Sequence, residues 1–335
     1  MRAATELYPE SEASLPAGEI VAMDGEDFYL IENVDAMPPF LVNLVSANDH
    51  WMFIASNGAL TAGRRNADNS LFPYCTQDRL FDSASGTGSL SLIWARGETG
   101  GAATFWEPFA PRPSGVGAKR RLYKNLLGSR IVFEEVLEKW GLAYRCEWAF
   151  SAKYGFVRKS TLDNGGGERL EIRILDGIQN LLPYGLDQAF VSQFSNLADA
   201  YKKCELLPDE GVGVYYLSSI PTDRSEPSEG LKATTVWSAE ADFATLLLSA
   251  GQAEAFRRGR PLQGERDVRG RRCAYLAERV FALEPEAKRV WRTVADINQD
   301  ACRVEALRAA IVSGEASSSA VAEDVARNSL QIGRA

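Results

Sequence analysis

Apolar and polar residues alternate in short runs along most of the chain, up to about residue 295. The runs are rich in β-branched and aromatic residues, and Gly, Asn, Asp and Pro separate them, which is typical of strands joined by turns. In one run, Tyr144, Cys146 and Trp148 would share a face, as in a sheet with one buried side. Runs of this kind lie at residues 28–31, 40–45, 51–54, 90–94, 103–106, 130–136, 142–150, 170–175, 213–217, 232–237, 272–277 and 288–295.

A dozen or so strands would curl or split into stacked layers rather than form one flat sheet. We therefore expect a mainly β fold, a large antiparallel β-sandwich over residues 19–300, preceded by a loose lead-in at 1–18. An amphipathic segment at 241–258 follows Ser238, which resembles a helix N-cap, and predicts one helix within the sandwich. The segment 192–201 fits either a helix or an extended conformation.

The pattern changes in the tail, residues 301–335, which we expect to form a helical linker. Ala, Glu, Arg and Leu at helical spacing predict two helices there, at 301–311 and 319–331. The second helix needs a surface on which to bury Val321 and its apolar neighbours. We expect it either to pack back on the sandwich or to belong to a longer protein.

Charge and composition exclude several classes of partner. The net charge of −8 gives no basic footprint for nucleic acid or for an anionic membrane. The sequence has no run of eighteen apolar residues, and its first residues lack the apolar region of a secretory signal. We expect a cytoplasmic protein that binds neither nucleic acid nor membrane.

Cysteine and histidine usage gives no sign of a metal or another cofactor. The five cysteines are an odd number without a CxxC pair, so we expect reduced, mostly buried thiols and no zinc knuckle. The single histidine, His50, excludes a His-rich metal site within this chain. Because it lies beside Trp51 in an apolar run, we interpret it as a strand residue without a catalytic role.

A loop between two predicted strands is the most informative segment. Residues 57–69 contain two adjacent arginines and several asparagines, and Phe72-Pro73-Tyr74 follows. Amides and guanidinium groups bind hydroxyls in pairs, and aromatic rings cover the apolar faces of a pyranose. An ordinary structural loop, with its arginines in ion pairs, would carry the same residue types. The candidate sugar-binding residues are Arg64, Arg65, Asn66, Asn69 and Tyr74.

The carboxylates offer no catalytic pair. A glycoside hydrolase needs two carboxyl groups about 5 to 10 Å apart. Glu134 and Glu135 are adjacent in a predicted strand, so they should point to opposite faces. We expect the remaining candidates, which lie at strand ends or in loops, to be solvated charges or turn caps: Asp176, Asp187, Asp223, Glu226, Glu229 and Asp296. The glycine-rich segment 163–167 lacks a following Lys-Ser/Thr and is predicted as a hairpin turn.

The order of these elements resembles a known family. Residues 56–61, Gly63-Arg64, Phe72-Pro73-Tyr74 and 176–183, followed by two tail helices, are similar to the N-terminal β-supersandwich of cellobiose-phosphorylase-like glycoside phosphorylases and cyclic β-glucan synthases. The resemblance covers roughly residues 20–335. It implies a galactose-mutarotase-like sandwich that precedes an (α/α)₆ barrel, and in that family the barrel carries the general-acid carboxylate.

This sequence ends where that barrel would begin. The resemblance therefore implies a non-catalytic accessory domain, with no catalytic residue in the chain, whose barrel belongs to a longer form of the protein or to a separate chain. Its implied partners are an oligosaccharide, the barrel and a second copy in a homodimer, and the loop at 63–69 would lie at the mouth of the active site. We expect Arg64→Ala to weaken such an association and to leave folding nearly intact.

Two alternatives remain. A self-contained sandwich such as a mutarotase-like epimerase would need a general acid and a general base, usually His and a carboxylate, and one histidine fits this poorly. A pure protein-interaction module would need no sugar contact and would present an exposed apolar patch.

Overall fold

The computed structural model describes residues 15–98, 100–111, 118–219 and 230–334. Within these ranges the strands form three antiparallel sheets. Eleven described strands form the largest sheet, in the order β1 (Ala17–Met23), β2 (Glu26–Glu32), β9 (Ala118–Asn125), β10 (Ile131–Leu137), β11 (Leu142–Ser151), β12 (Gly155–Asn164), β20 (Lys288–Asp300), β16 (Lys232–Ser238), β15 (Val212–Leu217), β14 (Lys202–Leu207) and β18 (Asp267–Arg269).

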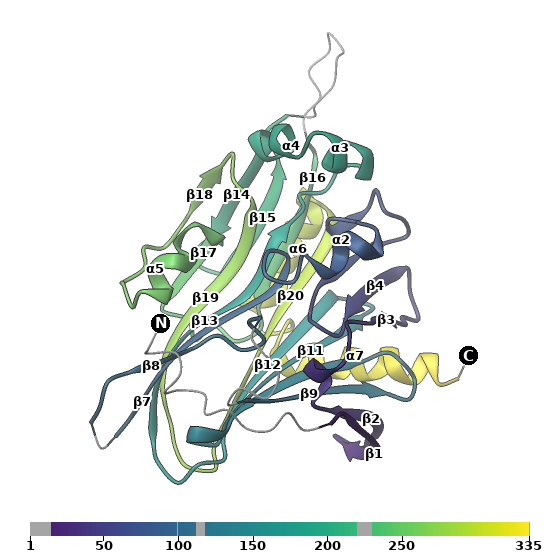
Figure 1. Ribbon diagram of the computed structural model, residues 1–335. Helices are drawn as coiled ribbons and strands as arrows, with labels where there is room; N and C mark the ends of the chain where they lie inside the picture. Colours follow the sequence, from purple (N-terminus) through teal and green to yellow (C-terminus); the bar gives the residue numbers. More distant parts are fainter. Residues whose placement is uncertain (1–14, 99, 112–117, 220–229, 335) are drawn as a thin grey trace.

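The two other sheets are smaller. The described strands of the second sheet are, in order, β17 (Thr245–Ser249), β19 (Cys273–Leu283), β13 (Leu170–Leu181), β7 (Gly88–Gly97) and β8 (Thr104–Trp106). Those of the third are β3 (Leu41–Leu44), β4 (His50–Ala55), β5 (Leu60–Arg64) and β6 (Ser70–Phe72). The predicted mainly β fold, a large antiparallel sandwich, is confirmed, and the third sheet is an addition to it (Figure 1).

One hydrophobic core joins the three sheets. The predicted inward face of β11 is confirmed, because Tyr144, Cys146 and Trp148 are all buried in this core. Ile174 of β13 packs there from the second sheet, and Ile54 of β4 from the third. The core therefore lies between the two larger sheets and extends under the smallest one.

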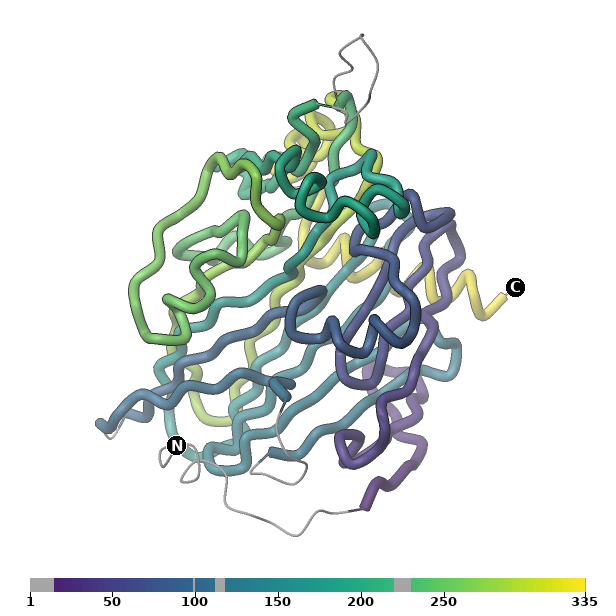
Figure 2. Tube along the Cα trace, turned by 45° about the horizontal axis from the view of Figure 1, so that its top comes forward, coloured from purple at the N-terminus to yellow at the C-terminus, as the bar shows by residue number. Residues whose placement is uncertain are grey.

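Two helices cover the outer face of the largest sheet. As predicted, the tail forms α6 (Ala301–Val312) and α7 (Ser318–Ile332). Val321 of α7 is fully buried against Trp237 and Val294, and Asp324 accepts hydrogen bonds from Ser151 Oγ and from the Lys153 amide, the latter at 2.9 Å. The second tail helix thus packs back on the sandwich, on the side away from the second sheet (Figure 2).

The remaining helices are short. Their bounds are Val34–Ala36 (η1), Gln77–Phe81 (α2), Glu138–Trp140 (η2), Gln188–Gln193 (α3), Ser195–Tyr201 (α4), Ala250–Gln252 (η3) and Ala253–Arg257 (α5). The open alternative at 192–201 resolves as helix. Three of the five cysteines are buried and all five are free thiols, as predicted.

The helix predicted at 241–258 is largely wrong. Thr245–Ser249 is strand β17, and only Ala253–Arg257 forms an α-helix there. Leu246 and Leu248 face the central core while Leu247 packs on the opposite side of the sheet. A strand buried on both faces is a continuous apolar run, which periodicity alone does not distinguish from a helix.

Two other predictions need correction. The segment 163–167 is not a hairpin turn, because β12 and β13 belong to different sheets and this segment connects them. Asn164 fixes the connection by donating from Nδ2 to the Glu168 and Leu283 carbonyls. The lead-in predicted at 1–18 falls mostly outside the described residues, and Ala17 already belongs to β1.

Candidate functional site

The connection between β5 and β6 contains the predicted loop. Hydrogen bonds within the loop fix its backbone conformation. The Arg64 amide donates to the Asn69 carbonyl at 2.8 Å, and the Asn69 amide donates to the Asn66 carbonyl at 3.2 Å. Arg65 adopts a left-handed conformation with φ of 63°. A Cβ at Gly63 would lie 2.3 Å from the Asn69 carbonyl oxygen, so only glycine fits before the two arginines.

Two carboxylates neutralise the arginine pair. Arg64 Nε contacts Asp49 at 2.9 Å, and its Nη1 contacts Asp296 at 3.0 Å. Arg65 Nε reaches the other oxygen of Asp49 at 3.3 Å, and 74% of the Arg65 side chain remains exposed. The two arginines therefore differ: Arg64 belongs to a partly buried ion-pair network, whereas Arg65 presents its charge to solvent.

Asp296 is the unusual member of this network. Only 16% of its side chain is exposed. Burial raises the pKa of Asp296 to about 6, and Arg64 only partly offsets this effect. The prediction that Asp296 is a solvated charge or a turn cap is therefore wrong.

A hollow of about 190 Å³ lies beside this network. It is bounded by the loop, by the end of β20 and by the first turn of α6. Asn298 has a φ of 62°, and its Oδ1 is buried without a hydrogen-bond partner among the described residues. The hollow is therefore lined mainly by guanidinium, carboxylate and amide side chains. Its lining residues are Asp49, Arg64, Arg65, Asn69, Ile297, Asn298 and Arg303.

The structure brings four of the five candidate residues together. Arg64, Arg65 and Asn69 line the hollow, and Asn66 accepts a hydrogen bond from Asn69 Nδ2 at 2.6 Å. Tyr74 lies apart, packed edge-on against Trp51 at 5.9 Å between ring centroids and lining a different depression.

Four contributors were missed as site residues. Asp49, Asn298 and Arg303 carry no local motif, and Asp296 was assigned to the solvated carboxylates. Nothing in the sequence predicts that β20 lies beside the loop.

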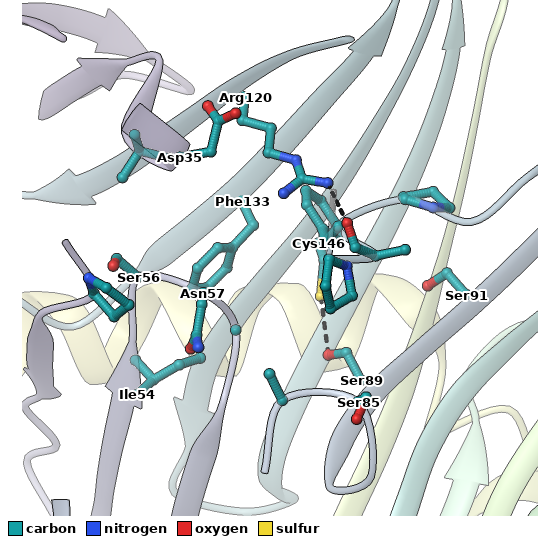
Figure 3. Close-up of a pocket in the computed structure, with 18 of the residues that line it drawn as sticks. Asp35, Ile54, Ser56, Asn57, Ser85, Ser89, Ser91, Arg120, Phe133 and Cys146 are labelled. Atoms are coloured by element: carbon teal, nitrogen blue, oxygen red, sulfur yellow. Dashed lines mark hydrogen bonds between the residues drawn. The ribbon is translucent and has the colours of Figure 1, made fainter. Parts of the chain in front are cut away.

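A larger cavity, of about 500 Å³, opens between the inner faces of the two larger sheets (Figure 3). Ser89 and Ser91 of β7 and Phe133 of β10 belong to its walls, and Arg120 of β9 reaches it from the largest sheet. The turn at 56–58 and the third sheet border its opening.

Glu134 and Glu135 point to opposite faces of β10, as predicted, and both are fully buried. Glu134 accepts from Arg121 at 3.0 Å, and Glu135 accepts from Arg120 at 2.8 Å. Neither is a free carboxylate that could act with the other as a hydrolytic pair.

A buried ion pair lies beneath the large cavity. Arg158 Nη1 is 2.8 Å from Asp176 Oδ2, and both side chains are fully buried. Burial opposes ionisation, but Arg158 and nearby hydroxyl donors lower the pKa of Asp176 to about 2. The expectation that Asp176 is solvated or a turn cap is therefore wrong, because the residue lies between the two sheets.

The other candidate carboxylates divide into two groups. Asp187 caps α3 by accepting from the Phe190 amide at 2.6 Å, as predicted for a turn cap. Asp223, Glu226 and Glu229 lie outside the described residues.

The single histidine has a structural environment. His50 lies in β4, where its ring stacks on Phe150 at 5.2 Å and meets Phe156 edge-on at 5.1 Å. Burial and the nearby Arg64 lower the pKa of His50 to about 4, so the ring is neutral at pH 7. It does not line either of the two cavities described above.

The described ranges contain neither a metal-ligand cluster nor a membrane-spanning helix. No three His, Cys, Asp or Glu side chains converge there as metal ligands. None of the described helices is both long and apolar enough to cross a bilayer.

Comparisons with known proteins give distant structural likenesses. No family model and no curated protein matches the sequence. A bacterial glucoamylase complexed with acarbose has a TM-score of 0.48 at 8% identity, over 95% of this chain and 39% of the glucoamylase chain. A protein described as a kojibiose phosphorylase from the human microbiome has a TM-score of 0.35 at 9% identity, over 91% of this chain and 32% of its own.

A protein from Klebsiella pneumoniae subsp. pneumoniae described as an aldose 1-epimerase has a TM-score of 0.34 at 9% identity, over 89% of this chain and 91% of its own. The chain thus spans less than half the length of the glucoamylase and the phosphorylase. At these identities the likenesses assign no activity.

Proposed function

We propose that the chain is a non-catalytic, carbohydrate-associated sandwich domain, and that the loop from Arg64 to Asn69 holds an oligosaccharide or contacts an (α/α)₆ catalytic domain. The observation that carries this proposal is the hollow at the junction of β20 and α6. There, the exposed Arg65 guanidinium lies beside the Asn69 amide, and both are groups that bind hydroxyls. The resemblance to the phosphorylase supersandwich supports the same position.

The chemistry of the large cavity supports a non-catalytic role. An epimerase needs an acid and a base that can exchange protons with a sugar. Among the carboxylates on the cavity side, Glu135 pairs with Arg120 at 2.8 Å and Glu107 with Arg257 at 2.7 Å, while Asp35 is half-buried and Asp82 exposed. The only histidine, His50, packs between phenylalanine rings away from the cavity.

Calorimetric titration of β-linked gluco-oligosaccharides, such as cellotriose, tests the proposal. We expect saturable binding to the native chain and weaker binding to Arg65→Ala by about 1 to 3 kcal/mol, the scale of charge-assisted hydrogen bonds. Arg258→Ala is the matched control, because Arg258 is an exposed arginine directly after α5 and does not line the hollow.

Arg65 is a better probe than Arg64. Loss of Arg64 would leave the partly buried Asp296 without its partner, so a fall in stability would accompany any fall in binding. Equal affinity of the native chain and Arg65→Ala would overturn the assignment of the loop. Turnover of a disaccharide that disappears when one carboxylate of this chain is replaced would favour a self-contained enzyme.

A further inference from the structure

The large cavity has the walls of a small-molecule site. Its volume of about 500 Å³ falls within the range of roughly 300 to 1,000 Å³ that ligand pockets occupy. Phe109 and Phe133 contribute aromatic surface, and their rings meet edge-on with centroids 6.2 Å apart. Apolar ring faces of this kind suit the C–H faces of a sugar ring.

The cavity also has polar groups held in fixed orientations. Ser89 Oγ accepts from Arg158 Nε at 2.9 Å and from Trp148 Nε1 at 3.3 Å, so its own proton is available to a partner. Its hydroxyl also lies 3.3 Å from Cys146 Sγ, a weak partner that a ligand oxygen can replace (Figure 3).

Gln179 complements Ser89. It is buried, and its Nε2 donates to the Ser85 carbonyl at 3.1 Å. Its carbonyl oxygen has no partner in the described part of the chain and can accept a hydrogen bond. One donor and one acceptor beside aromatic walls match a hydroxyl, which both donates and accepts.

The charges around the cavity select against anions. Three carboxylates, Asp35, Asp82 and Glu107, line it, and Arg120, which shares the cavity face of the sheet with Phe133, already pairs with Glu135 at 2.8 Å. An added phosphate or carboxylate would meet this excess of negative charge without a free guanidinium. An uncharged ligand avoids the penalty.

We propose that this cavity is a binding site for an uncharged pyranose sugar, held by Ser89 and Gln179 and flanked by Phe109 and Phe133. The buried Arg158–Asp176 pair positions Ser89 from behind, because Arg158 contacts both residues. This site is separate from the loop of Arg64 to Asn69 and does not depend on the proposed function of that loop.

Thermal shift and calorimetric titration with glucose, galactose and mannose test the proposal. We expect at least one hexose to bind saturably, and the 6-phosphate of the same hexose to bind at least tenfold more weakly. Ser85→Trp fills the cavity from an exposed turn, and Gln179→Met removes the acceptor at nearly constant volume. Each variant should weaken hexose binding at least tenfold.

Controls separate this site from the loop and from misfolding. Ser219→Trp adds the same side chain at an exposed position outside the cavity and should leave hexose affinity unchanged, as should Arg65→Ala. If the melting curve shows that Ser85→Trp is unfolded, the hexose affinity of Gln179→Met alone tests the proposal. The proposal is overturned if no hexose binds, if binding survives in a folded cavity variant, or if the phosphate ester binds as tightly as the parent sugar.

Discussion

Replacement of Asp296 by asparagine should change how the stability of the protein depends on pH. Burial raises the pKa of Asp296 to about 6, from a usual value of 3.8, despite the neighbouring Arg64. In the unfolded chain the carboxyl group regains its ordinary pKa, so between pH 4 and pH 6 the native state holds a proton that the unfolded state has lost. The contribution of Asp296 to stability is therefore complete below pH 4 and declines as the pH rises through 6.

The size of the effect follows from the shift. A difference of one pKa unit corresponds to about 1.4 kcal/mol, so a shift of this size makes native Asp296 less favourable by roughly 3 kcal/mol at pH 7 than at pH 3. The asparagine side chain of the variant would carry no charge at either pH. The free energy of unfolding of Asp296→Asn minus that of the native chain should therefore rise by roughly 3 kcal/mol across this range.

Urea unfolding, followed by tryptophan fluorescence at pH 3, 4, 5, 6 and 7, measures this difference. Asp49→Asn is the matched control with the opposite sign. Burial acts to raise the pKa of Asp49, but hydrogen bonds and charge from Arg64 outweigh it and hold the pKa below its usual value. A stability difference for Asp296→Asn that is constant with pH would refute the account of this buried carboxylate.

Three further outcomes are expected. Asp176→Asn leaves the buried Arg158 without a charged partner. It should lower the free energy of unfolding, measured with a chemical denaturant, by about 3 to 5 kcal/mol, and a decrease below about 1 kcal/mol would argue against a buried ion pair. Val321→Ala should lower the free energy of unfolding by about 2 kcal/mol. Val312→Ala should leave it nearly unchanged, because that side chain is 75% exposed. Equal effects of the two substitutions would contradict the packing of α7. The isolated chain should release no phosphate and form no sugar from β-linked disaccharides, and measurable turnover by the purified chain would contradict its non-catalytic role.

The sandwich was predictable because alternation is a local signal. Strand β11 follows it closely, with Tyr144 and Trp148 on the inner face. The signal fails where both faces of a strand are buried, as at Leu246 and Leu247 of β17. It also does not reveal which strands pair, so the connection after β12 appeared to be a hairpin although it joins two sheets.

The candidate site was predictable only in its contiguous part. Arg64, Arg65 and Asn69 are close in sequence and the structure keeps them together. Asn298 and Arg303 reach the same hollow from more than 220 residues further along the chain, through the packing of β20 and α6. A single sequence carries no signal for such a long-range contact, and the cavity between the sheets likewise arises only from tertiary packing.

Hydrogen–deuterium exchange with and without saturating cellotriose tests the central claim most directly. If the loop holds an oligosaccharide, amide protection should increase in peptides that contain residues 60–74 and 296–303, which border the hollow. Peptides from the far edge of the largest sheet, such as those of β18, should exchange at unchanged rates. Cellotriose that binds without added protection at 60–74 would contradict the assignment of this loop as the carbohydrate site.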